Sequence, residues 1–183
     1  MAGKRPAART ASAPGARTAV VVAGWNSEVT ARLADGALAV AEAAGASADR
    51  FDVAGSFELP AAAAILAATG RYDAVVPIGC LVRGETPHFD VLARAVADGL
   101  MRLSLEYPVA IPFGVLTCDT IAQARARAGG RAGNKGREAM EAALAMVALR
   151  QATAPTRRRI ARRAASASAR STSTKLTRSP GTS

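Results

Sequence analysis

The sequence has few of the residues that mark a metalloprotein, a disulfide scaffold or a membrane protein. Its 183 residues include two cysteines, one histidine and seven aromatic residues. Cys80 and Cys118 have neither a CxxC nor a metal-ligand spacing, which favours reduced thiols and predicts no bound metal. No apolar run approaches the roughly 18 residues needed to span a bilayer, and the N-terminus has no apolar segment typical of a secretory signal. We therefore expect a cytoplasmic protein that does not bind membranes.

Acidic residues are missing from both ends of the chain. Residues 1–17 contain four Lys and Arg residues and residues 151–183 contain eight, whereas neither stretch contains Asp or Glu. Residues 18–150 hold the other 12 basic residues and all 14 acidic ones, so their net charge is −2 although the whole chain carries +10. Because a fold that binds nucleic acid usually carries positive charge on the folded domain itself, the middle of the chain does not predict that function.

Large apolar side chains are also scarce at both ends, so these segments cannot bury enough surface to offset chain entropy. We predict a disordered basic segment at residues 1–17, one domain at residues 18–151 and a disordered tail at residues 152–183. The arginines at 157–159 and 162–163 fit two interpretations. The tail binds the phosphates of nucleic acid or another acidic partner, or it is a solvated segment that keeps the protein in solution.

Short apolar runs alternate with helical stretches in the middle of the chain. We expect strands at residues 19–23, 51–54, 74–78 and 109–116, and helices at 26–44, 60–70, 89–106, 119–128 and 135–149. This alternation predicts an α/β fold, a three-layer αβα sandwich in which helices cover both faces of a four-stranded parallel sheet. Ligands of such sheets bind beyond the carboxyl ends of the strands. Residues 25–26, 56–58, 83–88 and 117–119 follow the four strands, so we expect a site there.

His88 is the only histidine, and its ordinary pKa near 6.5 suits proton transfer at neutral pH. A lone histidine is more often structural. Its loop also contains Arg83, Glu85 and Thr86, which is typical either of a site or of plain solvated surface.

Arg127, followed by glycines and Lys135, suits an oxyanion such as phosphate. A basic helix end capped by glycine is the alternative interpretation. The chain has neither a GxxxxGK[ST] nor a GxGxxG motif, so no nucleotide cofactor is predicted.

Aromatic side chains offer a surface for a flat ligand at two places. Trp25 follows the first strand, and Phe113 lies in the fourth predicted strand, where a core position is the alternative. Glu58 either presents a carboxylate to a ligand or stabilises a helix N-terminus.

Taken together, these segments resemble the 6,7-dimethyl-8-ribityllumazine synthase family across about Val20 to Met146. The matching stretches are residues 55–60 (GSFELP), 78–90 (IGCLVRGETPHFD), 113–117 (FGVLT) and 127–129 with 133–136. The resemblance implies a flavodoxin-like fold and the penultimate step of riboflavin biosynthesis. In that step 5-amino-6-(D-ribitylamino)uracil condenses with 3,4-dihydroxy-2-butanone 4-phosphate, without metal or organic cofactor.

The resemblance also assigns roles. Trp25 stacks on the pyrimidine, with Asn26 beside it, and His88 donates a proton. Glu85, Thr86 and Arg127 bind the butanone phosphate, while Phe113 and Lys135 come from a neighbouring subunit of a homopentamer. The groups that hold the ribityl-pyrimidine are Ser56, Phe57, Glu58, Cys80, Leu81 and Val82.

The sequence does not decide the assembly, the protein partner or between the two functions. The pentamers either remain free or pack into a 60-subunit icosahedral shell, and riboflavin synthase is a candidate partner. The rival function is a flavodoxin-like carrier of flavin or lumazine, which needs neither Arg127 nor His88. The chain departs from the family at Trp25, where Phe is usual, and at Ser56, which is often Ala.

Overall fold

The computed structural model describes residues 13–154. Its main sheet contains β1 (Arg17–Ala23), β2 (Ser47–Val53), β3 (Ala74–Val82) and β4 (Gly114–Cys118), all parallel, in the order β2-β1-β3-β4. The chain divides into two compact units, residues 1–149 and 150–183, and only residues 150–154 of the second are described. The predicted four-stranded parallel sheet is confirmed.

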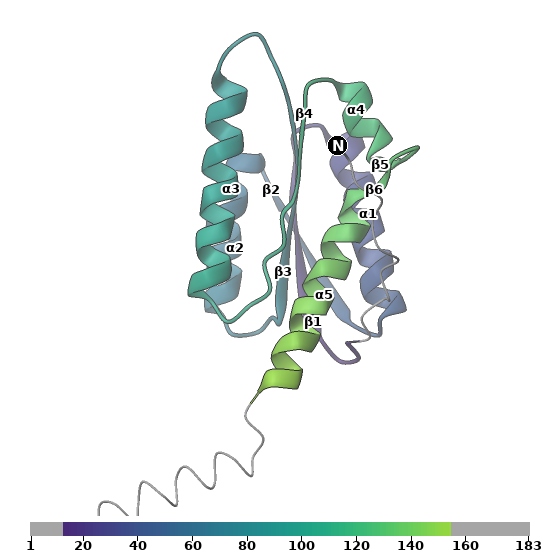
Figure 1. Ribbon diagram of the computed structural model, residues 1–183, viewed down its shortest axis with the longest axis vertical. Helices are drawn as coiled ribbons and strands as arrows, with labels where there is room; N and C mark the ends of the chain where they lie inside the picture. The colour runs from purple at the N-terminus through teal and green to yellow at the C-terminus, as the bar shows by residue number, and fades with distance from the viewer. Residues whose placement is uncertain (1–12, 155–183) are drawn as a thin grey trace, which may run out of the picture. The chain divides into compact units, whose positions relative to one another are not determined.

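Helices cover both faces of this sheet (Figure 1). α1 (Ser27–Ala43), α4 (Ile121–Ala126) and α5 (Lys135–Thr153) lie on one face, and α2 (Leu59–Ala68) and α3 (His88–Glu106) lie on the other. A 3₁₀ turn, η1 (Ser56–Glu58), precedes α2, and a small hairpin of β5 (Ala128–Gly130) and β6 (Gly133–Asn134) joins α4 to α5. The predicted three-layer sandwich is therefore confirmed.

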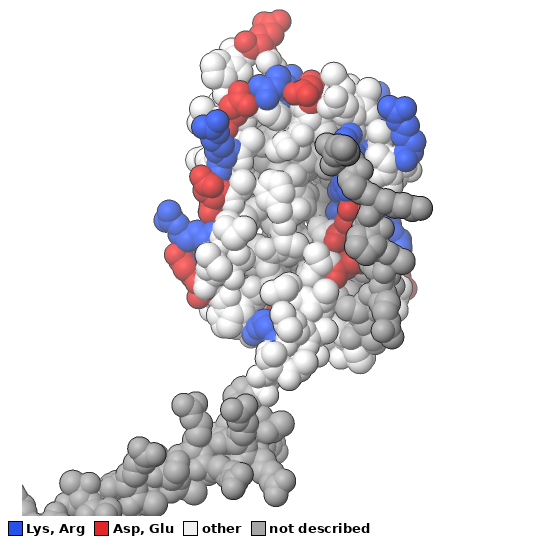
Figure 2. All heavy atoms as spheres, in the orientation of Figure 1, with Lys and Arg blue, Asp and Glu red and all other residues white. Residues whose placement is uncertain are grey.

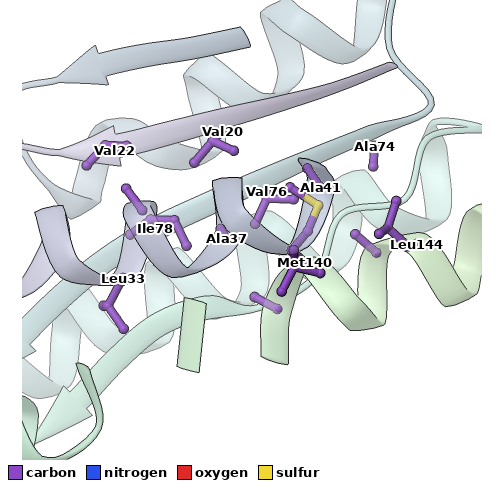
Figure 3. Close-up of a cluster of buried hydrophobic side chains, with 14 of the residues drawn as sticks. Val20, Val22, Leu33, Ala37, Ala41, Ala74, Val76, Ile78, Met140 and Leu144 are labelled. Carbon is purple, nitrogen blue, oxygen red and sulfur yellow. The ribbon is translucent and has the colours of Figure 1, made fainter. Parts of the chain in front are cut away.

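The two central strands are buried on both faces, which places one apolar core on each side of the sheet. On the α1 and α5 side, Leu33 and Met140 pack against Val76 and Ile78 (Figure 3). On the α2 and α3 side, a second core forms around Leu59, Val75 and Val96. Burial on both faces explains why β1 and β3 read as continuous apolar runs in the sequence.

A glycine at the start of α5 brings this helix close to α1. A Cβ at Gly136 would overlap the backbone of Leu33, so no other residue fits there without separating the helices. Asn134 holds the same junction: its Oδ1 accepts hydrogen bonds from the backbone N–H groups of Gly136 and Arg137, and its Nδ2 donates to the carbonyl of Arg32. The depth of α5 is therefore set by direct contact with α1.

Three strands differ from their predicted positions. β3 runs to Val82, four residues past its predicted end at residue 78. β2 starts four residues before the predicted residue 51, because it is an edge strand with mostly exposed side chains and offers no apolar run. The fourth strand runs over Gly114–Cys118 instead of residues 109–116, with only an isolated bridge between Ala74 and Ala110 before it. Pro112 has no N–H to donate, which accounts for the interruption.

Residues before the predicted domain start at Thr18 pack onto the core. Ala13 and Ala16 are buried in the core on the α1 side, and the N–H of Gly15 donates to the carbonyl of Gly45. These residues precede Thr18, the predicted start of the domain, and α5 runs two residues past the predicted limit at 151. The rest of both predicted tails, including the arginines at 157–163, lies outside the described residues. Over residues 13–154, no helix has the length and apolarity to cross a membrane.

Candidate functional site

Residues that follow β1, β2 and β3 gather around one cleft of about 720 Å³, which we call the β1–β3 cleft. It contains nine of the predicted site residues. Its lining consists of Trp25, Asn26, Gly55, Ser56, Phe57, Glu58, Cys80, Leu81, Val82, His88 and Leu92. The strand order places these segments together because the carboxyl ends of parallel neighbours share an edge of the sheet.

Two large aromatic side chains stand open at this cleft. Trp25 is 74% exposed and Phe57 is 60% exposed. The indole of Trp25 lies against Gly55, where a Cβ would come within 3.1 Å of its Cδ1 atom. Exposed rings at a concave site offer a flat, apolar surface on which a heteroaromatic ligand can stack.

Asn26 ties the ends of two strands together at the floor of the cleft. It adopts a left-handed conformation (φ 56°), which Asn tolerates better than most residues. From there its Nδ2 donates a 2.9 Å hydrogen bond to the carbonyl oxygen of Cys80. Asn26 therefore fixes the carboxyl end of β1 relative to that of β3.

Ser56 places a hydroxyl under the cleft without a partner among the described residues. The side chain is 4% exposed, and its Oγ makes no hydrogen bond there. A Cβ at Gly79 would lie 2.7 Å from this Oγ atom, so the glycine makes room for η1 to pack on β3. Buried unpaired hydroxyls are uncommon.

Both cysteines are free and buried, one beside each of the clefts. Burial, with smaller contributions from Cys118 and Glu28, raises the pKa of Cys80 to about 12. Burial likewise raises the pKa of Cys118. Both thiols thus stay protonated at neutral pH, which argues against a cysteine nucleophile. No group of three or more metal-ligating side chains occurs in the described part of the chain.

His88 begins α3 and is exposed at the edge of the β1–β3 cleft. Leu92 lies one turn further along the same helix and completes that wall. Glu85 and Thr86 are exposed in the preceding loop and line neither cleft. Within one chain, the histidine is therefore the only part of the predicted 85–88 segment that reaches the cleft.

A second hollow of about 410 Å³ lies along the edge strand β4, and we call it the β4 groove. It is lined by residues 112–118 and by Arg127, Lys135, Glu138, Ala139 and Ala142. Figure 2 shows the face in front of β4: charged side chains gather along its rims, and the hollowed middle is largely uncharged. Phe113 is 50% exposed here, so its predicted alternative role as a core residue is wrong.

The cations of this groove are held by local contacts. The guanidinium of Arg127 donates to the carbonyl of Gln123 at 3.0 Å, and Lys135 Nζ lies 2.7 Å from an Oε atom of Glu138. The N–H of Lys135 donates to the carbonyl of Arg127, so the small hairpin sets the two residues side by side. Two neighbouring cations form an arrangement suited to an oxyanion.

The two clefts share no residue. Within the described chain, His88 lines one cleft and Arg127 lines the other. The sequence placed Arg127 and Lys135 in one basic, glycine-rich segment, and both residues line the β4 groove. It missed Leu92, which shares a helix face with His88 four residues earlier, and Glu138, which follows Lys135 by three; both spacings could have signalled them.

Comparison with known proteins gives one consistent result. The family model for 6,7-dimethyl-8-ribityllumazine synthase matches residues 15–151. The 6,7-dimethyl-8-ribityllumazine synthase of Salinibacter ruber is 51% identical over 138 residues, which cover 74% of this chain and 88% of the relative. The proteins of that name from Methylobacterium radiotolerans and Parabacteroides distasonis are 50% and 46% identical, covering 75% and 70% of this chain and 84% and 82% of the relatives.

The family model covers both clefts and every element from β1 to the greater part of α5. The chain belongs to the 6,7-dimethyl-8-ribityllumazine synthase family.

Proposed function

We propose that this protein forms 6,7-dimethyl-8-ribityllumazine from 5-amino-6-(D-ribitylamino)uracil and 3,4-dihydroxy-2-butanone 4-phosphate, the penultimate step of riboflavin biosynthesis. The observation that carries the proposal is that the two clefts present different chemical groups. One presents exposed aromatic rings, and the other presents paired cations. A flat uracil and a sugar-derived phosphate match these two chemistries.

The β1–β3 cleft holds the ribitylaminouracil in this proposal. Trp25 stacks on the ring, and Phe57 extends the same apolar surface. Glu58 accepts hydrogen bonds from the ribityl hydroxyls. Asn26 and the segments 56–58 and 80–82 shape the floor, because the Asn26–Cys80 bond holds the ends of β1 and β3 together.

The β4 groove holds the butanone phosphate. Arg127 binds it through its planar fork, and Lys135 adds a second positive charge. Glu85 and Thr86 approach the phosphate from the neighbouring chain's loop, which is consistent with their exposure and with their position outside both clefts of their own chain. Phe113 covers the apolar part of the substrate.

The chemistry needs proximity first and proton transfer second. An amine of the uracil attacks the ketone carbonyl, and this step gains mainly from holding both partners in place. Loss of water gives an imine, and transfer of the proton on the neighbouring carbon to the leaving group lets the C–O bond to phosphate break, so that inorganic phosphate departs with its charge neutralised by Arg127. His88 donates the proton that a departing oxygen requires. The enol left by phosphate loss becomes a ketone, and attack of the second uracil amine on this ketone closes the ring and releases a second water. No cofactor takes part in this sequence of steps.

A complete site requires two chains in this proposal. The wall containing His88 comes from one subunit, and the groove containing Arg127 and Lys135 comes from its neighbour in a homopentamer. The open edge of β4 and the exposed ring of Phe113 support this arrangement, because a subunit contact would cover both. The same proposal takes residues 13–153 as the catalytic domain and places it in the cytoplasm, consistent with two free thiols.

The direct test supplies purified full-length protein with both substrates and follows the fluorescent lumazine product. We expect product well above the uncatalysed rate. Product at the background rate, with tight binding of lumazine or flavin, would favour the carrier function instead. Light scattering on the same sample distinguishes pentamers from a 60-subunit shell, and added riboflavin synthase tests that candidate partner by co-sedimentation.

A complementation experiment tests the shared site. His88→Ala and Arg127→Ala chains are unfolded together in equal amounts and reassembled. Each shared site needs His88 from one chain and Arg127 from its neighbour. Random mixing supplies both in about one quarter of the sites, so activity returns to roughly that fraction of wild type. Sites contained within single chains would instead leave the mixture as inactive as its components.

A further inference from the structure

Arg83 follows β3 directly and is the residue that connects the sheet to the start of α3. Its backbone N–H donates to the carbonyl of Cys118 at 2.9 Å, which extends the β3–β4 ladder by one residue. Its Nε donates a 3.0 Å hydrogen bond to a carboxylate oxygen of Asp119, just beyond β4. The backbone N–H and the Nε atom of Arg83 are therefore both hydrogen-bonded at the carboxyl edge of the sheet.

The two terminal nitrogens of the same guanidinium bind the first turn of α3. Nη1 and Nη2 donate to the two carboxylate oxygens of Asp90 at 2.9 and 3.1 Å. The guanidinium carbon also lies 4.3 Å from the ring centroid of Phe89. Phe89 and Asp90 are the two residues that follow His88, so Arg83 contacts the helix on the residues next to the imidazole.

The loop that leads into this turn is open to solvent. The helix is preceded by Pro87, which makes no side-chain capping hydrogen bond, and residues 83–88 are all exposed. Gly84 has no atom within 4 Å of the position a Cβ would take. Asp90 stands where an acidic residue often caps a helix, yet its carboxylate is bound to Arg83, which lowers the pKa of Asp90.

Arg83 is also unsuited to a role as a substrate ligand. It lines neither the β1–β3 cleft nor the β4 groove. Its guanidinium makes three hydrogen bonds to two carboxylates and lies on an aromatic ring. A phosphate would have to displace two negative charges to bind there, whereas the guanidinium of Arg127 donates to a neutral carbonyl, that of Gln123.

We propose that Arg83 is a positioning residue, which acts through Asp90, Asp119 and Phe89 to hold His88 at the β1–β3 cleft. The three hydrogen bonds hold the first turn of α3 in a fixed position relative to the edge of the sheet. Effects on catalysis rest on the proposed function, because His88 matters only if it moves a proton. The geometry of the turn does not depend on that activity and can be tested separately.

The catalytic arm of the test is a double-mutant cycle between Arg83→Gln and His88→Ala. Displacing a reacting group by about 1 Å can lower rates by up to a hundredfold, and we expect Arg83→Gln to lower kcat about tenfold with little change in either KM. In the His88→Ala background the same change should alter kcat less than about twofold, because the group it positions is gone. Independent, multiplying effects would overturn the proposal, and so would a loss confined to the KM of the phosphate substrate.

Matched variants separate positioning from general stability. Arg50 pairs with Asp52 on β2, and its side chain is 41% exposed, against 43% for Arg83. Arg50→Gln should therefore leave kcat unchanged. Asp119→Ala removes one of the three bonds and is expected to reduce kcat less than Asp90→Ala, which removes two. Arg83→Lys keeps the charge but lacks the fork, so it recovers only part of the lost rate.

The structural arm uses hydrogen exchange of the full-length protein, read by mass spectrometry over residues 84–92. Arg83→Gln should speed exchange in this segment several-fold, whereas Arg50→Gln should not. Unchanged exchange would overturn the positioning role even if activity fell. If the wild-type protein makes no lumazine, the proposed function fails, and the exchange result alone still decides whether Arg83 holds the turn.

Discussion

The β1–β3 cleft and the β4 groove differ in the side chains that they present. The cleft has two exposed aromatic rings, with Glu58 and His88 as its ionisable partners beside the buried thiol of Cys80. The groove has one exposed ring and a pair of cations next to an edge strand. Each therefore offers what the other lacks, a stacking surface in one case and an oxyanion site in the other. Under the proposed function, one chain therefore carries two half-sites, and activity depends on the assembly.

The largest effect is expected in the groove. Arg127→Ala removes the charge that neutralises the leaving phosphate, and kcat/KM should fall about a thousandfold, comparable to losing a principal oxyanion donor. Arg137→Ala is the matched control, because this exposed arginine lies close by on α5 and lines neither cleft. Equal losses in the two variants would mean that the groove attracts phosphate by its overall charge and not through Arg127.

The second effect belongs to the cleft. His88→Ala should lower kcat about a hundredfold with little change in KM, because a positioned proton donor contributes mainly to the transition state. Steady-state kinetics with each substrate varied in turn gives both constants. A higher KM with unchanged kcat would show that the imidazole binds substrate instead of transferring a proton.

A smaller effect separates the two substrates. Trp25→Ala should raise the KM for the ribitylaminouracil about tenfold through lost stacking, and it should leave the KM for the butanone phosphate unchanged. Trp25→Phe keeps a ring and should stay within about twofold of wild type. An equal rise in both KM values would break the assignment of one substrate to each cleft.

The smallest effect is expected at the thiols. Cys80→Ala should leave kcat within about twofold of wild type at neutral pH, because a thiol with its pKa raised to about 12 is no nucleophile there. The raised pKa of Cys80 also makes the free energy of unfolding depend on pH. An unfolded thiol ionises near pH 9 and the folded one near 12, so this contribution is complete below pH 9 and declines as pH rises.

The pH dependence can be measured as thermal midpoints at one protein concentration. Between about pH 8 and 11 the midpoint of the wild type should fall more steeply than that of Cys80→Ala. Parallel slopes would show that Cys80 is not responsible for the decline.

The sequence predicted the layers of the fold because its central strands are apolar on both faces and its helices end at recognisable residues. Gly45 and Gly70 both adopt positive φ just past helices, and Pro60 lies in the first turn of α2. It ended the central strand β3 four residues early, and it misplaced β2 and β4, the two edge strands. An edge strand buries less surface, so its boundaries depend on backbone pairing that composition does not reveal.

The sequence predicted the membership of the site better than its geometry. Trp25, Glu58 and His88 share a cleft as expected from the strand order. The separation of Arg127 from His88 within one chain could not be derived from strand ends, because it depends on α5 lying beside β4. The hydrogen bonds from Arg83 to Asp90 and Asp119 could not be derived from the sequence either, because these residues come together only in the folded chain, beside the ends of β3 and β4.

The exposed indole at the cleft also equips the protein with a probe of its own. Trp25 is the only tryptophan in the chain, so the intrinsic emission of the native protein reports on a single, known position. A titration with the uracil substrate alone would follow occupancy of that position without any label, and a titration with the phosphate substrate alone would serve as its blank. Folding, assembly and ligand entry can thus be read from one optical signal whose origin is unambiguous.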